Sequence, residues 1–490
     1  MAKEDVEYNW DKICSCIGQH ARFKFQELNR ESASNPLEFQ APRVYRGTRI
    51  TVDIYDSKRG DYIQMKNLLV KRRRGLLGSQ DYVDFHNSMT HQRSESESSY
   101  PEEVTTGYCI RKKIASTVYG GIYKGVVMKK RSLLLGETAV MRDKTKVKNK
   151  NSSGSLNRIV EDDILDNVTF EKNQQVTPRS GSGVWEATDQ HVVIKASSWA
   201  KIRRLRGKHL EDPIKEIQAM QLLGDYHSNI VTHIDAIQDD STLYNVMQYC
   251  DEGDLYGEVM SEIHANGRVD ENCARIWFRQ LIVALYHLQQ KGVCHNDLSL
   301  ENIMVHQHRI KLVDFGLAFR VPYKPNTHNC SRPIEGYATD VSDSFQQRRL
   351  LIKARGRGSN WGYMSPEVVA KEMYFDGFAH DLWAAGVILY ILLIGHKPFH
   401  WAHKSDKQFL LLCESGSLKQ SLVYWDIELS PSAIDLLQNM LWRDPRRRLT
   451  LEKVMKHPWV LDLVQPKSDS GQVKEIHKSG KTKWFQKKKK

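Results

Sequence analysis

The feature that most constrains the fold of this chain is a helix pattern that leads into two polar loops. Within Glu271–Gln290, apolar side chains recur every three or four residues and Gly292 follows directly, which predicts an amphipathic helix with a glycine stop. The first loop carries Asp297 and, five positions later, Asn302, and the second loop begins with Asp314 before Phe-Gly. Two acids and an amide in this order are suited to handling magnesium and ATP. The sequence therefore predicts a phosphotransferase site.

A lysine and a glutamate upstream of these loops are candidates for the same site. A short β-branched run ends at Lys195, as expected where a strand presents an ammonium group to phosphates. A helical pattern then opens at Pro213 and places Glu216 beside its apolar edge. Glu216 either turns inward to pair with Lys195 or remains an ordinary surface carboxylate. The two downstream loops favour the pair.

A further candidate is the strand-like run at residues 244–250, which leads into a turn that contains Asp254. A strand that ends in this way can offer backbone hydrogen bonds to an adenine ring and a carboxylate to a ribose. A plain connection between a strand and a helix has the same pattern. Both interpretations remain open at this point.

The charge of the chain is strongly positive, with a formal net charge of +13 over 490 residues. The basic residues are clustered, so they favour either a solvated surface or the binding of acidic partners such as nucleic acid, anionic lipid or acidic proteins. The clusters are residues 71–74, 129–131, 144–150 and 487–490.

Cysteine usage and hydropathy indicate the compartment. The eight cysteines are scattered without a C-x-x-C pair, which argues against a zinc site and for a reducing environment. The first twenty residues carry acids and lack an apolar core, so no signal peptide is expected. The longest apolar run, residues 382–395, is too short to span a bilayer and predicts a buried helix. We expect a soluble protein of the cytoplasm, the nucleus or both, with no transmembrane segment.

The chain divides into three parts by composition. Residues 1–167 lack sustained periodicity and are expected to be partly disordered, although residues 45–55 and 116–127 have strand-like content. Residues 168–463 are first rich in strand patterns and then in helix patterns, which predicts an α+β domain with two lobes. Residues 464–490 are polar and rich in lysine, so a disordered basic tail is expected.

Residues 168–463 resemble the eukaryotic protein kinase family, serine/threonine type, and look closest to its calcium/calmodulin-dependent-kinase-like group. The resemblance implies a bilobal kinase fold, with a small antiparallel sheet and one helix in the first lobe and a larger helical second lobe. It rests on matched motifs. These are His295-Asn296-Asp297, Asp314-Phe315-Gly316, Ser365-Pro366-Glu367, Asp381, Arg448 and His457-Pro458-Trp459-Val460.

The resemblance also implies roles for single residues. Asp297 would be the catalytic base, Asn302 and Asp314 would bind magnesium, and Lys195 would pair with Glu216 to hold the phosphates of ATP. Met247 would lie beside the adenine, and Arg448 would pair with Glu367. The nucleotide-binding residues implied in this way are Gly181, Gly183, Val184, Lys195, Met247, Tyr249, Cys250 and Asp254.

The sequence departs from the family pattern at three places. Asn296 replaces an arginine that in many kinases contacts a phosphorylated activation segment, and Ser299 and Leu300 stand where serine/threonine kinases usually carry Lys-Pro. The glycine loop, placed at residues 181–183, has G-x-G without a third glycine in register. Its alternative is a flexible turn before a strand.

Three functions remain as alternatives. The first is ATP- and magnesium-dependent phosphorylation of serine or threonine in protein substrates. Asp254 and Glu301 resemble family positions that can accept arginines of a peptide substrate, which implies a preference for basic residues before the acceptor. The second is a pseudokinase scaffold, suggested by the incomplete glycine loop and Ser299. The third is a basic protein that binds nucleic acid or membranes and carries a kinase-like domain.

Overall fold

The computed structural model describes about three fifths of the chain, in two compact units. The first, called the barrel unit, comprises the described residues within 41–206 and 233–249, and the second, called the helical unit, comprises those within 39–40, 207–232 and 250–462. The described residues are 39–40, 42–56, 61–76, 106–131, 184–206, 208–224, 227–321, 323–324, 348–349, 351–353, 360–370 and 374–462.

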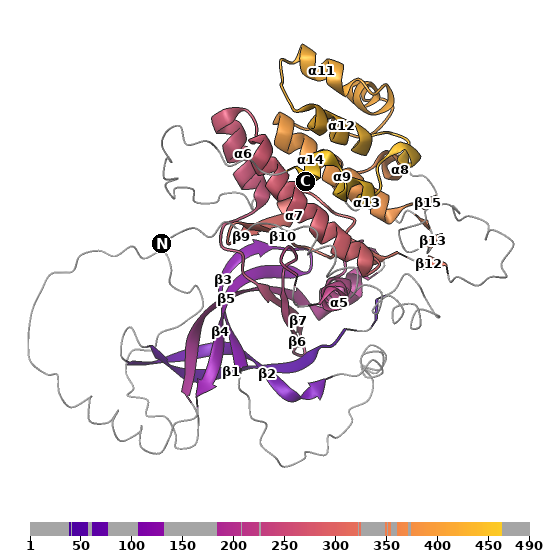
Figure 1. Ribbon diagram of the computed structural model, residues 1–490. Helices are drawn as coiled ribbons and strands as arrows, with labels where there is room; N and C mark the ends of the chain where they lie inside the picture. Colours follow the sequence, from indigo (N-terminus) through magenta and orange to yellow (C-terminus); the bar gives the residue numbers. More distant parts are fainter. Residues whose placement is uncertain are drawn as a thin grey trace, which may run out of the picture. The chain divides into compact units, whose positions relative to one another are not determined.

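Seven strands form a closed barrel in the order β1-β2-β3-β4-β5-β7-β6, coloured from indigo to magenta in Figure 1. A parallel pairing of Tyr45 in β1 with Ile237 in β6 joins the two ends of the sheet. The short helix α4 (Trp199–Leu205) follows β5. The strands are β1 (Tyr45–Asp56), β2 (Asp61–Leu76), β3 (Thr106–Ser116), β4 (Gly120–Arg131), β5 (Val184–Ser198), β6 (His233–Gln238) and β7 (Thr242–Gln248).

The barrel packs apolar side chains on both faces of its strands. Successive side chains of a strand point to opposite faces, so neighbours separate into two clusters. Leu69, Tyr108 and Val127 belong to a cluster with residues of β5, β6 and β7, whereas their neighbours Leu68 and Cys109 join a second cluster. The structure places residues 116–127 at the end of β3, in the turn at residues 117–119 and in β4 from Gly120, so the predicted strand content is confirmed on either side of a turn.

A polar network closes the barrel where β2 and β3 approach β6. The Lys71 ammonium lies 2.6 Å from a carboxylate oxygen of Asp235, and the Tyr108 hydroxyl donates to the other oxygen. Burial raises the pKa of Tyr108, and the neighbouring Asp235 raises it further. Lys71 belongs to the basic cluster at residues 71–74, so one of these cations has an internal structural partner.

Because β1 to β4 share one sheet with β5, the sheet crosses the domain boundary predicted at residue 168.

The helical unit contains most of the helices and four two-stranded sheets. The sheets pair β8 (Val293–Cys294) with β11 (Phe319–Arg320), β9 (Ile303–His306) with β10 (Arg309–Leu312), β12 (Tyr323–Lys324) with β13 (Arg348–Arg349), and β14 (Ile352–Lys353) with β15 (Tyr374–Phe375). The helices are α5 (Pro213–Leu223), α6 (Leu255–Asn266), α7 (Glu271–Gln290), α8 (Pro366–Val369), α9 (Gly377–Ile394), α10 (Lys407–Phe409), α11 (Leu418–Tyr424), α12 (Pro431–Met440), α13 (Leu451–Met455) and α14 (Pro458–Leu461), with 3₁₀ turns at η1 (Leu300–Asn302) and η3 (Pro445–Arg447) and a π turn at η2 (Leu410–Glu414).

Helices α7 and α9 form the centre of this unit (Figure 1). The predicted helix α7 is confirmed: Asp270 caps its first turn by accepting from the backbone N–H of Asn272, and Gly292 follows its end with φ of 65°. The apolar run predicted as a buried helix lies in α9, which begins five residues earlier, at Gly377. Among the described helices, α9 is the one with the length and hydropathy of a membrane span, yet 94% of that stretch is buried inside the protein, as in a core helix.

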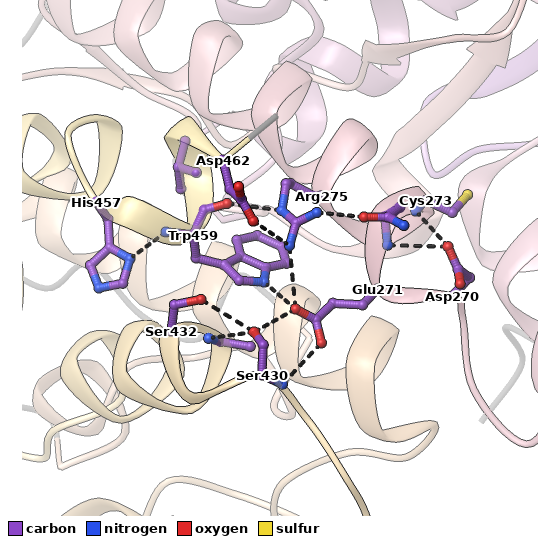
Figure 2. Close-up of polar contacts among 12 residues, drawn as sticks. Asp270, Glu271, Cys273, Arg275, Ser430, Ser432, His457, Trp459 and Asp462 are labelled. Carbon is purple, nitrogen blue, oxygen red and sulfur yellow. Dashed lines mark hydrogen bonds and ion pairs between the residues drawn. The ribbon is translucent and has the colours of Figure 1, made fainter. Parts of the chain in front are cut away.

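Helix α14, near the C-terminal end of the helical unit, packs against the first turns of α7 (Figure 2). The Trp459 ring lies against the Arg275 guanidinium, 4.9 Å from centroid to carbon, and its Nε1–H donates to Glu271 at 2.8 Å. The Ser430 hydroxyl donates to the same carboxylate at 2.6 Å. These hydrogen bonds lower the pKa of Glu271 although burial opposes the change. The His-Pro-Trp-Val motif therefore has a structural role at this end of the unit.

Candidate active site

The loop after α7 is shaped by the buried carboxylate of Asp381 on α9. Its two oxygens accept from the backbone N–H of His295 at 2.7 Å and of Asn296 at 2.9 Å. Asn296 has φ of 64°, a left-handed conformation that a residue other than glycine adopts at a cost. Burial raises the pKa of Asp381 to about 6, although the two amides favour its ionised form. Asp381 thus holds the backbone that positions Asp297.

The Asp297 carboxylate is oriented by Asn302. The Asn302 Nδ2 donates to the Asp297 carbonyl at 2.7 Å and to its Oδ2 at 3.0 Å. Both donors of the amide therefore face Asp297, and Oδ1 is the Asn302 atom suited to a cation. The two residues predicted to act together lie together.

A hairpin brings Asp314 to the same place. Ile303, the first residue of β9, is paired with Leu312, the last residue of β10. The residues just outside the two strands, Asn302 and Val313, are therefore neighbours. The Val313 N–H donates to the Asn302 carbonyl at 3.0 Å. Asp314 follows with φ of 64°, a strained backbone conformation two residues after the end of β10. Residues twelve positions apart in sequence are in this way aligned by antiparallel pairing.

The neutral side chain of His295 forms hydrogen bonds with both loops. Burial lowers the pKa of His295 to about 4, so its ring is uncharged at neutral pH. Its Nε2 bonds to the Val313 carbonyl at 3.0 Å and its Nδ1 accepts from the Asp297 N–H at 3.3 Å. These partners require the proton on Nε2. The Phe315 ring packs against the imidazole at 4.9 Å between centroids.

The residue that replaces the family arginine contacts the second loop directly. The Asn296 side-chain Nδ2 donates to the carbonyl of Leu317, three residues after Asp314, at 3.3 Å. This hydrogen bond connects the loop of Asp297 directly to the loop of Asp314.

Helix α5 carries Glu216 and begins next to the second loop. Asp212 caps the helix by accepting from the Ile214 N–H at 2.9 Å, and Pro213 occupies the first helical position. The Asp212 N–H donates to the carbonyl of Gly316 at 3.1 Å. Glu216 is only 4% exposed. It is therefore not an ordinary surface carboxylate, which was the alternative in the sequence.

Lys195 and Met247 lie on adjacent strands of the barrel unit. Lys195 on β5 is paired with Ile122 on β4 and with Asn245 on β7, and Met247 is paired with Val193. Met247 is buried. Because Lys195 belongs to the barrel unit and Glu216 to the helical unit, their ion pair stays a prediction.

The other residues predicted to line the nucleotide are Tyr249, Cys250 and Asp254, and the structure shows the surroundings of each. The Tyr249 ring lies 4.4 Å from the Lys124 ammonium. Cys250 is buried, which raises the pKa of its thiol to about 11. Asp254 caps α6 by accepting from the Gly257 N–H at 2.8 Å. The capping contact matches the plain strand-to-helix alternative, and the role of Asp254 toward a ribose stays a prediction.

Val184, the one described residue of the predicted glycine loop, lies at the opposite end of β5 from Lys195. Gly181 and Gly183 lie outside the described residues, but Val184 opens β5 opposite Arg131, eleven residues before Lys195. At about 3.3 Å per residue this separation is on the order of 35 Å. Val184 therefore cannot cover phosphates that Lys195 binds.

The turn at residues 117–120, between β3 and β4, lies at the Lys195 end instead. Gly120 is paired with Ser197, two residues beyond Lys195. The Thr117 N–H donates to the Gly120 carbonyl at 3.0 Å, and the Gly120 N–H donates to the Thr117 hydroxyl at 2.9 Å. A Cβ at Gly120 would lie 2.0 Å from the carbonyl oxygen of Ala196, so only glycine fits. The Gly120-Gly121 pair between two strand-like runs is the signal that could have found this turn.

Comparison with known proteins extends these findings. Residues 181–460 match the protein kinase domain family. The chain is 33% identical over 247 residues to the maternal embryonic leucine zipper kinase of Danio rerio, which covers 50% of this chain and 31% of the relative. It is 33% identical over 273 residues to CBL-interacting serine/threonine-protein kinase 15 of Arabidopsis thaliana, covering 56% and 55%. It is 31% identical over 263 residues to serine/threonine-protein kinase DCLK3 of Homo sapiens, covering 52% and 34%.

The chain thus spans roughly a third to just over half of the length of these relatives. They agree with the resemblance to serine/threonine kinases and to the calcium/calmodulin-dependent-like group that the motifs indicated. The family match covers more than half of the chain and contains Asp297, Asn302 and Asp314. The chain belongs to the protein kinase domain family.

Proposed function

We propose that the chain transfers a phosphoryl group from ATP to serine or threonine hydroxyls of protein substrates. The observation that carries the proposal is the arrangement of Asp297, Asn302 and Asp314. The Asn302 amide orients the Asp297 carboxylate, and the hairpin of β9 and β10 leads from Asn302 to Asp314. Asp297 would accept or orient the proton of the incoming hydroxyl. Most of the rate would come from the placement and neutralisation of the transferring group.

The donors at this site fit a divalent cation, which we propose to be magnesium. Asn302 offers a side-chain oxygen and Asp314 a carboxylate, and magnesium prefers oxygen ligands. Among the described residues, no three histidines, cysteines, aspartates or glutamates form a metal-binding group. This fits a cation that takes its remaining ligands from phosphates and water. Bound there, the cation would supply charge neutralisation of the phosphates.

The nucleotide would depend on residues of both units. Lys195, held extended by Glu216, would bind its phosphates, and Met247 with Tyr249 and Cys250 would line the adenine. We propose that the turn at residues 117–120, rather than residues 181–183, covers the phosphates. Its support is its position at the Lys195 end of β5.

A preference for basic residues before the acceptor remains part of the proposal. Burial raises the pKa of Glu258 on α6, and the negative charges of Glu252, Glu262 and Asp254 raise it further. These acids therefore lie close enough to repel one another. Glu301, which follows Asp297 in the loop, is exposed. A basic peptide segment would relieve this excess of negative charge.

Radiolabelled phosphate transfer from ATP to mixed peptides, with magnesium present, tests the function. The wild type should transfer phosphate to serine or threonine, while Asp314→Ala and Lys195→Met should lose at least about a hundredfold of the rate. Asp240→Ala, a change at an exposed acid of the barrel unit, is the matched control and should keep full activity. Wild-type protein that binds ATP but transfers nothing would establish the scaffold alternative.

The revised glycine turn can be tested separately with Thr117→Val. The substitution keeps the shape of the side chain but removes the hydroxyl that closes the turn. The KM for ATP should rise several-fold while the melting temperature changes little. An unchanged KM would place phosphate coverage elsewhere.

For the location in the cell, we propose the cytoplasm, the nucleus or both, which fractionation of cells expressing the chain would test.

A further inference from the structure

A serine of the barrel unit follows three cations that have no acidic partner. Ser116, the last residue of β3, is preceded within five positions by Arg111, Lys112 and Lys113, and all four side chains are exposed. Among the residues that the structure describes, none of the three cations forms a salt bridge, and the Ser116 hydroxyl forms no hydrogen bond. The hydroxyl and the cations are therefore both available to a partner.

The same sequence pattern occurs at Thr450, but there the groups are engaged. Thr450 is the other described serine or threonine with three cations in the five positions before it. Its hydroxyl caps α13 by accepting from the Lys453 N–H at 3.4 Å. One of its cations, Arg448, is bonded to the buried carboxylate of Glu367. The comparison favours Ser116 as the acceptor of a group that basic residues attract.

The segment that ends at Ser116 lies at an open edge of the sheet. Strand β2 pairs with β3 at residues 107–109, so residues 110–116 of β3 pair with β4 alone among the described strands. An extended strand with an unpaired edge is a surface that another protein chain can bind. Ser116 is thus presented to a partner in an extended segment.

A lysine lies beside the position that a phosphate on Ser116 would occupy. Ser116 is paired with Gly121 on β4, so the two residues share one face of the sheet. A Cβ at Gly121 would lie 3.1 Å from Cε of Lys113, which shows that the Lys113 side chain crosses this face next to Gly121. A phosphate on Ser116 would therefore find an ammonium group for a charge-assisted hydrogen bond.

This face is opposite to the one on which Lys195 lies. Gly121 is paired with Ala196 and Ile122 with Lys195, and successive side chains of a strand point to opposite faces. A phosphate on Ser116 would consequently be separated from the Lys195 ammonium by the sheet. It would not compete with a nucleotide that Lys195 binds.

We propose that Ser116 is a phosphorylation site, modified by a second copy of this chain, and that Lys113 holds the phosphate. The inference rests on the proposed function and names one of its substrates. Charge complementarity favours this chain as the enzyme, because the acidic residues of α6 match the three cations before Ser116.

The reaction is an ordinary phosphoryl transfer. The Ser116 Oγ forms a bond to the γ-phosphorus of ATP while the bond between that phosphorus and the oxygen bridging to ADP breaks. ADP leaves, and the hydroxyl proton passes to Asp297 of the second copy.

Phosphosite mapping on a catalytically inactive copy tests the proposal. Full-length Asp314→Ala protein is incubated with wild-type enzyme, ATP and magnesium, and its phosphopeptides are identified by mass spectrometry. We expect a phosphate at Ser116 and none at Thr450. In the inactive copy, Arg111→Ala/Lys112→Ala should slow the modification of Ser116 at least about fivefold.

The matched control for this change is Lys129→Ala/Lys130→Ala, which removes two exposed lysines at the other end of β4 from Gly121. It should leave the rate at Ser116 unchanged. Circular dichroism verifies that both double variants are folded.

The melting temperature of the inactive copy tests the role of Lys113. Phosphorylation should raise it by about 2 °C. Lys113→Met should remove the rise, whereas Lys130→Met should keep it. Ser116→Ala treated in the same way should show no rise, which assigns the effect to the phosphate at this serine.

The outcomes separate the proposals. Transfer to neither peptides nor the inactive copy would overturn the phosphotransfer function itself. Transfer to peptides with Ser116 left unmodified, or an unchanged rate in Arg111→Ala/Lys112→Ala, would overturn the site at Ser116 while the phosphotransfer function stands. A rise in melting temperature that persists in Lys113→Met would overturn the role of Lys113.

Discussion

At the scale of single residues, Glu367 and Arg448 show what a correctly placed pair contributes. Their side chains form two hydrogen bonds of 2.8 and 2.7 Å, and both are 3% exposed. The Arg448 guanidinium also lies 4.6 Å from the Trp383 ring. The resemblance to kinases implied this contact, and the structure confirms it. A buried pair with such geometry is costly to break because either partner alone is an uncompensated buried charge.

We therefore predict that Arg448→Met lowers the free energy of unfolding by about 3 to 5 kcal/mol. Arg446→Met is the matched control, since Arg446 is 88% exposed in its side chain and its substitution should leave the stability nearly unchanged. Urea unfolding followed by tryptophan fluorescence measures both. The double variant Arg448→Met/Glu367→Leu should recover part of the loss. Equal stability of Arg448→Met and Arg446→Met would contradict the argument.

At the scale of elements, the closure of the barrel depends on a narrow seam between β1 and β6. Gly47 lies at this seam, and a Cβ there would be 2.3 Å from a methyl group of Ile237 and 3.0 Å from the Val70 carbonyl. Parallel pairing at the seam covers Tyr45 and Arg46. The barrel thereby leaves fewer open sheet edges, which are prone to pair with other chains.

Gly47→Ala should consequently destabilise the protein by about 1 to 3 kcal/mol, the usual cost of overpacking. Gly257→Ala is the control: its Cβ would meet only its own helix cap at 3.4 Å, in the first turn of α6. It should be neutral or stabilising by up to about 1 kcal/mol. Thermal unfolding of the two variants beside the wild type gives the comparison. A melting temperature for Gly47→Ala at or above that of Gly257→Ala would show that the seam is not tight.

At the scale of the whole molecule, buried titratable groups couple stability to pH. Burial lowers the pKa of His227 to about 3 and those of His295 and His380 to about 4. In the unfolded chain a histidine has a pKa near 6.5. Between these values the unfolded state binds more protons than the folded state, so stability falls as pH falls below about 6.5. Asp381, whose pKa is raised to about 6, acts in the opposite direction and offsets part of this effect.

We expect the free energy of unfolding to be lower at pH 5 than at pH 7 by on the order of 4 kcal/mol, as the balance of three histidines against one aspartate. Urea titrations at the two pH values measure the difference. His380→Phe should reduce the dependence on pH even where it changes stability itself. A stability that is constant or higher at pH 5 would show that these histidines become protonated in the folded state.

The candidate site illustrates what could be predicted and what could not. Asp297, Asn302 and Asp314 were identified because they lie in short contiguous motifs, and the hairpin between them requires only neighbouring residues. The burial of Glu216 and the cap at Asp254 were open in the sequence, because one helical face does not show what it packs against. The turn at residues 117–120 could not be placed near Lys195 from the sequence, because its distance from Lys195 depends on the register of β4 and β5, which residues far apart in sequence determine.

The sequence by itself determined the local elements and the family: a periodic helix at Glu271–Gln290, a buried helix in α9, and loops whose side-chain chemistry suits phosphotransfer. Such features depend on residues within one or two helical turns of each other. Only the tertiary structure decided that the strands upstream of residue 168 close a barrel with β5, β6 and β7, and that the turn at residues 117–120 lies beside Lys195. The pairing of β4 with β5 joins residues more than fifty positions apart and that of β1 with β6 residues more than a hundred apart, and the register is determined by the packing of both faces rather than by any local pattern.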